Sequence, residues 1–439
     1  MSMPITVVGT GYLGTAHGVG MAELGHEVLG VDVDKDRIDA LSEGRVPFYE
    51  PGLAEPLARH VAAGRLRFTT SYEEAAAFGK VHFLCVNTPQ RPGGDSADLR
   101  NLHGAVDRLA PLLDRPALVV GKSTVPVGTA ARLSARILDK APAGADVELA
   151  WNPEFLREGH ALADTLRPDR IVVGAETPNA VAVLSKVYAP LLDADVPMVC
   201  SGFATAELVK SAANAFLATK VSFINAMAEL CEATGGDVTE LARALGHDAR
   251  IGDRYLRPGL GFGGGCLPKD LRAFRARARE LGSGRSLAFL GEVDGINMRR
   301  RERMVELVRE ECGADLSGLR VAALGAAFKP DSDDVRDSPA LHVAATLRAH
   351  GARVSVYDPR ANANAARVFT GLRYADSVER AAAGADVVLL LTEWQEFRDL
   401  DPGPLAEVVS DRAVIDGRNA LDPDRWRAAG WRYRALGRS

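Results

Sequence analysis

The chain contains 439 residues, 47% of them hydrophobic and 25% charged, and carries a formal net charge of −5. This length and composition predict a globular protein of two or three domains. They exclude a strongly basic nucleic-acid-binding protein, and no apolar run reaches the roughly 18 residues of a membrane span.

Five cysteines are scattered along the chain and include no CxxC pair: Cys85, Cys200, Cys231, Cys266 and Cys312. An odd number without paired spacing argues against a disulfide framework and against a zinc site, so we expect no bound metal. The first residues lack the basic and apolar regions of a secretory signal. Together these features predict a reducing, cytoplasmic location.

Strand and helix patterns alternate over roughly the first 200 residues. Strands are predicted within segments 5–9, 26–34, 80–89, 117–128 and 146–155, and the last three of these segments end in a loop. Helices are predicted over 11–25 and 71–79. The strands are near-continuous apolar runs separated by helices, which is typical of a parallel sheet covered on both faces.

The middle of the chain is helical. A run over 204–234 carries an apolar stripe of Leu208, Phe216, Phe223, Ile224, Met227 and Leu230. It exceeds the average helix length, so we expect it to connect domains or to pack against a partner subunit. Further helices are predicted over 267–282 and 286–311.

The alternation returns after Leu316 and resembles the beginning. Segments 319–325, 350–359 and 377–394 echo the first strand, the second strand and the helix–strand unit of the N-terminal part, in the same order. We therefore expect an α/β fold with two Rossmann-like, doubly wound parallel-sheet domains, joined by a long central helix and a helical middle domain. The predicted boundaries are 1–202, 203–312 and 313–439.

The segment VVGTGYLG predicts a dinucleotide site. Gly9, Gly11 and Gly14 have the GxGxxG spacing between a strand and a helix, and Asp32 ends the next strand about twenty residues on. A carboxylate at that place binds the ribose 2′-hydroxyl and repels a 2′-phosphate, which favours NAD over NADP. Arg37 argues against this preference for NAD, because a nearby arginine can bind the 2′-phosphate of NADP.

The segment GLGFGGGCLPKD, residues 259–270, points to a reactive thiol at Cys266. A lone cysteine is more often buried and inert, but glycines offer no apolar side chains to bury it. Cys266 precedes a predicted helix start, Lys269 lies within one turn, and Asp270 follows at i+4. Both a helix N-terminus and a cation favour a thiolate.

Two pairs at i, i+4 spacing accompany this loop. Glu154 and Glu158 follow a strand, and Lys210 and Asn214 share one face of the predicted central helix. Solvated surface side chains are the ordinary alternative for both pairs. A dinucleotide site combined with a nucleophilic cysteine suggests oxidation of an alcohol to a carboxylate through a thiohemiacetal and a thioester, with two NADH formed.

Eight segments in order are similar to the UDP-glucose/GDP-mannose dehydrogenase family: VVGTGYLG, VNTP, GKSTVPVGT, NPEFLREG, KSAANAF, RIGDRYLRPGLGFGGGCLPKD, AFKPDSDDVRDSP and DGRN. The resemblance runs from Ile5 to about Leu421. It implies NAD-dependent, four-electron oxidation of UDP-glucose to UDP-glucuronate. It also implies a homodimer formed through the central helix, with Arg250 reaching the partner subunit's site.

The resemblance implies six catalytic residues: Cys266 as the nucleophile, Lys210 steadying negative charge on the substrate oxygen, Asn214 positioning the substrate, Glu154 as general acid/base, and Asp270 with Thr124 holding a water. The implied NAD contacts are Gly9, Thr10, Gly11, Tyr12, Leu13, Gly14, Asp32, Arg37, Thr88, Thr124, Glu158, Lys269 and Arg336. The implied sugar-nucleotide contacts are Glu154, Phe155, Leu156, Arg157, Glu158, Lys210, Asn214, Arg250, Tyr255, Leu256, Arg257, Gly259, Phe262, Gly263, Phe328, Lys329 and Arg418.

The loop departs from the family pattern at two places, since Gly265 and Leu267 stand where many members have serine and phenylalanine. Alternative substrates are dTDP-glucose and UDP-N-acetylmannosamine. A two-electron hydroxyacid dehydrogenase is a second interpretation, against which the cysteine loop argues. A catalytically silent NAD-binding scaffold is a third, and it would be expected to lack Cys266, Lys210 or Glu154.

Overall fold

The computed structural model describes residues 2–438. The chain forms two compact units, each built from two stretches of sequence. The first contains the residues up to Ala213 together with Arg272–Gly282, and the second contains Asn214–Leu271 together with the residues from Ser283 onward.

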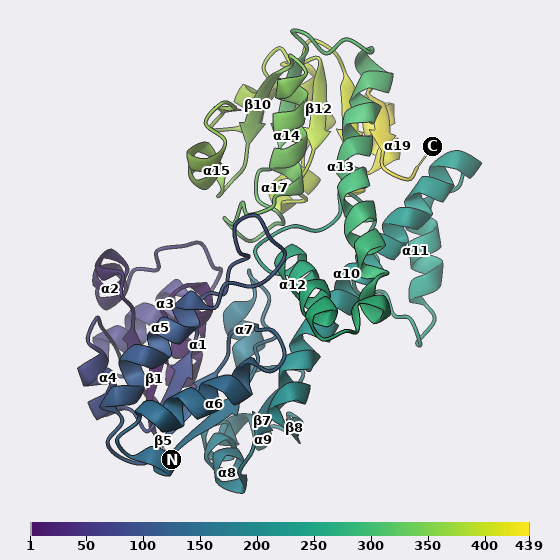
Figure 1. Ribbon diagram of the computed structural model, residues 1–439. Helices are drawn as coiled ribbons and strands as arrows, with labels where there is room; N and C mark the ends of the chain where they lie inside the picture. Colours follow the sequence, from purple (N-terminus) through teal and green to yellow (C-terminus); the bar gives the residue numbers. More distant parts are fainter. Residues whose placement is uncertain (1, 439) are drawn as a thin grey trace. The chain divides into compact units, whose positions relative to one another are not determined.

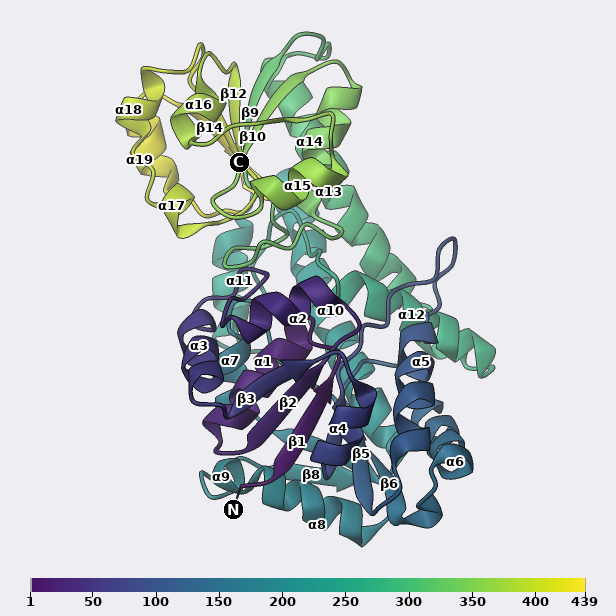
Figure 2. The same cartoon turned by 90° about the vertical axis from the view of Figure 1, so that its left-hand side faces the viewer.

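The first unit is built around an eight-stranded sheet of order β3-β2-β1-β4-β5-β6-β7-β8. The strands are β1 (Pro4–Val8), β2 (Glu27–Val31), β3 (Leu66–Thr69), β4 (Val81–Leu84), β5 (Ala117–Gly121), β6 (Val147–Trp151), β7 (Ile171–Ala175) and β8 (Met198–Ser201). Figure 2 shows β3, β2 and β1 side by side. The first six strands in spatial order are parallel, whereas β7 pairs antiparallel with β6. The predicted parallel α/β sheet is confirmed. The reversed direction of β7 and β8 was not predicted from the sequence pattern.

Helices cover both faces of this sheet (Figure 1). One face is covered by α4 (Tyr72–Phe78), α5 (Arg100–Leu109) and α6 (Thr129–Lys140), and the other by α1 (Tyr12–Glu23), α3 (Ala54–Ala62), α8 (Pro178–Val187) and α9 (Ala189–Leu192). Side chains of β1 alternate between the two cores, with Ile5 and Val7 on one side and Val8 on the other. Short helices α2 (Lys35–Ser42) and α7 (Ala161–Leu166) complete the unit.

The second unit contains a six-stranded parallel sheet of order β11-β10-β9-β12-β13-β14. Its strands are β9 (Arg320–Leu324), β10 (Arg353–Tyr357), β11 (Arg373–Tyr374), β12 (Val387–Leu390), β13 (Ala413–Asp416) and β14 (Arg432–Ala435). Renumbered along the chain, this order is 3-2-1-4-5-6, the same as that of the first six strands of the first sheet and typical of dinucleotide-binding domains. The turn after the first strand is repeated as well. The N–H of Gly9 donates to Val31 O at 2.7 Å, and that of Gly325 to Tyr357 O at 2.8 Å, both glycines having positive φ.

The remaining helices are α10 (Phe203–Thr234), α11 (Val238–Gly246), α12 (Leu267–Glu280), α13 (Leu290–Cys312), α14 (Pro339–Ala349), α15 (Asn362–Val368), α16 (Val378–Ala382), α17 (Gln395–Arg398), α18 (Pro402–Ala406) and α19 (Pro423–Ala428). The predicted long helix is confirmed as α10. Its apolar stripe divides: Ile224 is buried against α11, whereas Phe216, Phe223 and Leu230 are 67%, 48% and 57% exposed. Helix α13 starts later than predicted because a short 3-10 turn, Gly284–Leu287, precedes it.

Candidate active site

The three glycines after β1 have three different surroundings. Gly9 adopts φ +92, which favours glycine. A methyl group on Gly14 would lie 1.8 Å from Gly9 O, so this glycine allows α1 to start close under the turn. No atom lies within 4 Å of the place where a Gly11 methyl group would project. The turn therefore fits a pyrophosphate approaching the backbone at Gly11 and the N-terminus of α1.

Asp32 follows β2 and is buried beside this turn. Its Oδ2 accepts hydrogen bonds from the Thr10 N–H at 2.8 Å and from Arg37 Nη1 at 2.9 Å, and its Oδ1 accepts from the Asp34 N–H at 3.1 Å. Burial raises the pKa of Asp32, but these donors and the arginine charge outweigh burial and lower that pKa below its usual value. The group is an ionised carboxylate. Arg37 also pairs with Asp34 at 3.2 Å, so two carboxylates neutralise the arginine that would otherwise favour NADP.

The loops after β4 and β5 are joined by hydrogen bonds, one of them from the Ser123 hydroxyl to Val86 O at 2.6 Å. The Thr88 hydroxyl donates to Thr124 O at 2.7 Å. A buried glutamate of α10 fixes the end of the second loop, because Glu207 accepts from the Gly128 N–H at 2.7 Å and the Ala130 N–H at 2.6 Å. Glu207 thereby caps α6, and its role was not predicted from the sequence, although a glutamate three residues before Lys210 on a largely apolar helix is a usable signal.

Lys210 and Glu154 meet in the first unit. Lys210 is buried, and its Nζ lies 3.0 Å from Glu154 Oε1, while the Leu156 N–H donates to Glu154 Oε2 at 2.7 Å. The Phe155 ring lies beside two cations, with its centroid 3.9 Å from the Arg170 guanidinium and 5.6 Å from Lys210 Nζ. Glu154 is therefore held at both oxygens next to a lysine that cannot be a solvated surface residue.

The polar residues that accompany Cys266 lie in the second unit. Cys266 is exposed and immediately precedes α12, where its carbonyl accepts the first helical hydrogen bond, from the Asp270 N–H at 2.9 Å. Asp270 is buried, its Oδ2 accepts from Asn214 Nδ2 at 2.7 Å, and its Oδ1 lies 2.6 Å from Lys269 Nζ. Asn214 and Lys210 stand one turn apart on the unbroken helix α10. The thiol thus starts a helix whose first turn holds a fixed carboxylate and a cation.

The glycines before Cys266 give room to protein atoms. A methyl group on Gly263 would lie 2.3 Å from Asp337 O, and one on Gly264 would lie 2.8 Å from the Phe328 ring. At Gly265 it would meet the Arg336 guanidinium at 2.2 Å. These glycines therefore allow the loop to pack closely onto the loops of the C-terminal sheet.

Arg418 holds several of these loops together. Its guanidinium donates to Leu391 O at 2.7 Å, Gly261 O at 3.1 Å and Phe328 O at 3.3 Å, and it lies 3.3 Å from a Glu393 carboxylate oxygen. Lys329 Nζ lies 5.6 Å from the Phe328 ring centroid.

Other predicted contact residues have surface partners. Arg250 is exposed and pairs with Asp248 at 2.7 Å, Arg336 pairs with Asp334 at 2.6 Å, and Arg157 pairs with Asp164 at 2.7 Å. Tyr255 and Arg257 are exposed, but Leu256 between them is buried in the core with Ile224. The side chain of Leu256 is therefore occupied by core packing. Tyr12 hydrogen-bonds to Glu50, and Leu13 packs against the core under α1.

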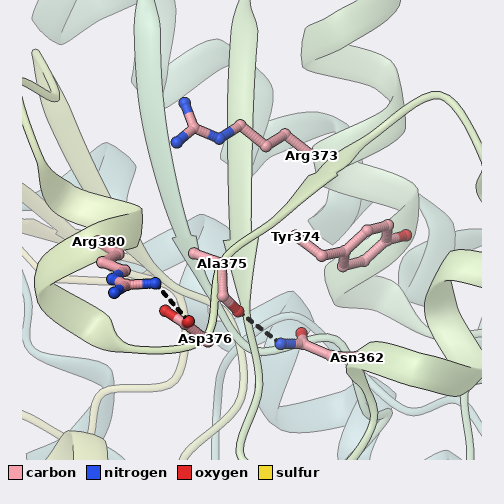
Figure 3. A pocket seen from close by; sticks show the side chains of 6 residues that line it. All are labelled: Asn362, Arg373, Tyr374, Ala375, Asp376 and Arg380. Carbon is pink, nitrogen blue, oxygen red and sulfur yellow. Dashed lines mark hydrogen bonds and ion pairs between the residues drawn. The ribbon is translucent and has the colours of Figure 1, made fainter.

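A pocket of about 350 Å³ lies at β11 in the second unit, lined by Asn362, Arg373, Tyr374, Ala375, Asp376 and Arg380 (Figure 3). None of these lining residues belongs to the predicted site. Among residues 2–438, no cluster of three or more His, Cys, Asp or Glu side chains could hold a metal ion. None of the described helices is both long and apolar enough to cross a membrane.

Within each unit the structure brings several predicted residues together. The first unit joins Gly9, Gly11, Gly14, Asp32 and Arg37 in one group and Glu154, Phe155 and Lys210 in another; the second unit joins Asn214, Lys269 and Asp270 beside Cys266. Asn225, Asn297 and Arg301, buried polar residues that contact the cysteine loop, were not predicted from the sequence. Their burial depends on tertiary contacts.

Three family models match the chain in succession. They describe the NAD binding domain, the central domain and the UDP binding domain of the UDP-glucose/GDP-mannose dehydrogenase family, over residues 3–192, 204–299 and 322–423. The chain is 42% identical, over 99% of its length and 100% of the relative's, to a UDP-glucose 6-dehydrogenase of Rhizobium meliloti. It is similar in structure to a UDP-glucose dehydrogenase of Pyrobaculum islandicum, with TM-score 0.92, 39% identity, and 100% and 98% of the two chains covered. A UDP-D-ManNAc dehydrogenase of Pyrococcus horikoshii has TM-score 0.85 and 26% identity, with 99% of each chain covered.

Proposed function

The chain belongs to the UDP-glucose/GDP-mannose dehydrogenase family, and from this premise we propose that it oxidises UDP-glucose to UDP-glucuronate with two molecules of NAD. Overall, one alcohol, two NAD⁺ and one water give one carboxylate, two NADH and three protons. The observation that carries the proposal is the exposed thiol of Cys266 at the start of α12, next to the Asn214–Asp270–Lys269 group. Two-electron alcohol oxidation needs no such thiol.

The Gly9–Gly14 turn would hold NAD⁺, which would supply the hydride acceptor for the two oxidations at C6 of the sugar. We assign to Lys210 the stabilisation of negative charge on the C6 oxygen. Its burial supports this role, because a cation in a low-dielectric place stabilises a developing oxyanion more strongly than a solvated one. Asn214, one turn further along α10, is assigned to position the substrate.

Cys266 is assigned to capture the aldehyde. Its sulfur bonds to C6, the carbonyl oxygen gains a proton, and a thiohemiacetal forms. Loss of a hydride and a proton from that adduct leaves a thioester. Lys269 lies within one turn of the thiol and supplies a positive charge beside the start of α12.

Hydrolysis of the thioester is assigned to Glu154, with a water held by Asp270 and Thr124. Water adds to the carbonyl carbon, its proton passes to the carboxylate of Glu154, and the carbon–sulfur bond breaks to return the Cys266 thiol. The hydrogen bond of the Leu156 N–H and the contact with Lys210 hold Glu154 in one orientation for this step.

The proposed substrate contacts are the residues implied by the family resemblance, with UDP bound in the second unit. Phe328, Lys329 and Arg418 support this assignment because they form one connected group at the ends of β9, β12 and β13. The family also contains a UDP-D-ManNAc dehydrogenase at 26% identity, so UDP-N-acetylmannosamine is the competing substrate, together with dTDP-glucose.

We also propose a homodimer formed through α10. Phe216, Phe223 and Leu230 recur every seven residues and remain exposed, which a second copy of the chain would cover. A cytoplasmic location is proposed because the five cysteines, all within the described residues, form no disulfide.

The test is the number of NADH formed per sugar nucleotide consumed, with limiting UDP-glucose and with dTDP-glucose and UDP-N-acetylmannosamine in parallel. We expect two NADH per UDP-glucose and loss of the second oxidation in Cys266→Ser. Cys200→Ser removes another exposed thiol and should leave the ratio at two. A ratio of one would overturn the four-electron mechanism, and a ratio of two with only another sugar nucleotide would change the substrate.

A further inference from the structure

We propose that Asn297 of α13 is a positioning residue for Cys266, acting through a two-sided hydrogen bond to Phe262. This inference rests on the proposed role of Cys266 as the nucleophile. It concerns residues of the second unit only, and the side-chain hydrogen bonds of Asn297 are made with the Phe262 backbone.

The side-chain amide of Asn297 binds both peptide groups of one residue. Asn297 is 1% exposed, its Oδ1 accepts from the Phe262 N–H at 2.7 Å, and its Nδ2 donates to Phe262 O at 3.0 Å. A buried amide with both halves satisfied by the same residue fixes that residue in position and in orientation.

Gly261 makes this contact possible. Its φ is +85, and a methyl group there would lie 2.0 Å from Asn297 Oδ1. Glycine is therefore required at this position both by the positive φ and by the approach of the Asn297 amide.

Arg301, one helical turn further along α13, also binds the carbonyl oxygen of Phe262. It is 2% exposed, its Nη2 donates to Phe262 O at 3.2 Å, and its Nη1 lies 2.8 Å from Asp337 Oδ1. Phe262 O thus accepts from two buried donors. Removing one partner of a buried ion pair is strongly destabilising, so Arg301 is a poor first choice for a test.

The segment between Phe262 and Cys266 explains why this anchor matters for the thiol. Gly263, Gly264 and Gly265 have no side chains of their own to fix the path, so contacts with neighbouring loops must hold it. The Gly264 N–H donates to Arg336 O at 2.9 Å, and the Asn297 contact fixes Phe262 two residues earlier.

Asn297→Asp keeps the size and the acceptor oxygen and removes the donor to Phe262 O. The matched control is Asn362→Asp. Asn362 also binds backbone on both sides, accepting from the Asp358 N–H at 3.0 Å and donating to Ala375 O at 2.7 Å, at the pocket of Figure 3. Gly261→Ala disrupts the Asn297 contact from the opposite side.

The two readouts are kcat against KM with UDP-glucose and NAD, and the rate at which iodoacetamide alkylates Cys266, followed by peptide mass spectrometry. We expect Asn297→Asp to lower kcat roughly 10- to 100-fold with KM for NAD changed less than about twofold, as for a misplaced reacting group. We also expect at least a threefold change in the alkylation rate, and the same pattern in Gly261→Ala.

Asn362→Asp, at a partly buried amide with the same kind of backbone contacts, should leave kcat and the alkylation rate unchanged. Equal effects of Asn297→Asp and Asn362→Asp on kcat and on alkylation, or none from either loop variant, would overturn the proposal. If Asn297→Asp does not fold, the kcat and the alkylation rate of Gly261→Ala decide the test. Alkylation needs no substrate, so a wild-type enzyme that fails to make two NADH would refute the proposed function separately.

Discussion

Lys122 is a buried cation in the first unit, in the loop that follows β5. Its Nζ lies 3.0 Å from Asn152 Oδ1 and 3.5 Å from the Tyr188 hydroxyl, and 5.7 Å from the Phe83 ring centroid. Burial lowers the pKa of Lys122 from 10.5 to about 8, an effect that neighbouring acidic groups, Glu154 among them, oppose only in part.

We predict that this lysine makes the protein more stable as the pH rises through the alkaline range. Between pH 8 and 10.5 the unfolded chain binds a proton at Lys122 that the folded chain has released, so the free energy of unfolding increases with pH. Relative to Lys122→Met, the wild-type value should rise by up to about 1.4 kcal/mol per pH unit in this window. Urea unfolding of both proteins from pH 7 to 10 measures the difference, and parallel curves would contradict the prediction.

At the level of single residues, the sequence predicted those functional residues that a short surrounding pattern marks. Asp32 could be assigned because it follows a strand at a fixed distance from three spaced glycines, and Cys266 because glycines surround it. Asn297 and Arg301 could not, since they lie in the polar run INMRRRER, which reads as a solvated helix face. Their burial comes from loops that are distant in sequence.

Helix α10 has two kinds of apolar residue, and only the structure separates them. Ile224 and Ala228 pack against Val238 of α11, whereas the exposed stripe of Phe216, Phe223 and Leu230 has no such cover within the described chain. The periodicity predicted one stripe because both groups fall within the wide apolar face of a long helix.

We predict that charge on the exposed stripe converts a dimer into a monomer. Phe223→Glu and Leu230→Glu place a carboxylate in the proposed interface, where it would be desolvated without a partner. Light scattering after size exclusion should give twice the chain mass of 46.7 kDa for the wild type and the single mass for these variants.

Leu138→Glu, on the exposed side of α6, serves as the control because it adds the same charge to another exposed leucine. It should keep the wild-type mass. A wild-type monomer, or a dimer that tolerates both glutamates, would refute the α10 interface.

Among the larger elements, the predicted strands and the long helix were confirmed, because each rests on a long apolar pattern. The direction of β7 was not predictable, since apolar content carries no information on strand polarity. The division into domains 1–202, 203–312 and 313–439 stays a prediction.

For the whole molecule, we predict that NAD raises the unfolding midpoint of the first unit and that UDP raises the midpoint of the second. The NAD-binding model covers residues 3–192 of the first unit, and the UDP-binding model covers residues 322–423 of the second. A ligand at one hundred times its Kd stabilises the folded state by about 2.7 kcal/mol. For a unit of this size, that corresponds to a shift in Tm of roughly 5–10 °C.

The tryptophans allow this to be measured. Trp151 is buried in the first unit, and the other three, Trp394, Trp426 and Trp431, are buried in the second. In Trp151→Phe, fluorescence reports on the second unit alone, so UDP should raise its midpoint and NAD should not. Equal shifts with both ligands would mean that the units unfold as one.

The way the chain passes between the two units has a consequence for inheritance. It crosses inside α10 after Ala213, inside α12 after Leu271, and once in a loop after Gly282. Each unit is therefore encoded by two separate stretches of the gene, and two of the three boundaries interrupt a helix. A single recombination event cannot exchange one unit for a foreign counterpart without leaving part of the old one behind. In evolutionary terms, the two units are inherited together.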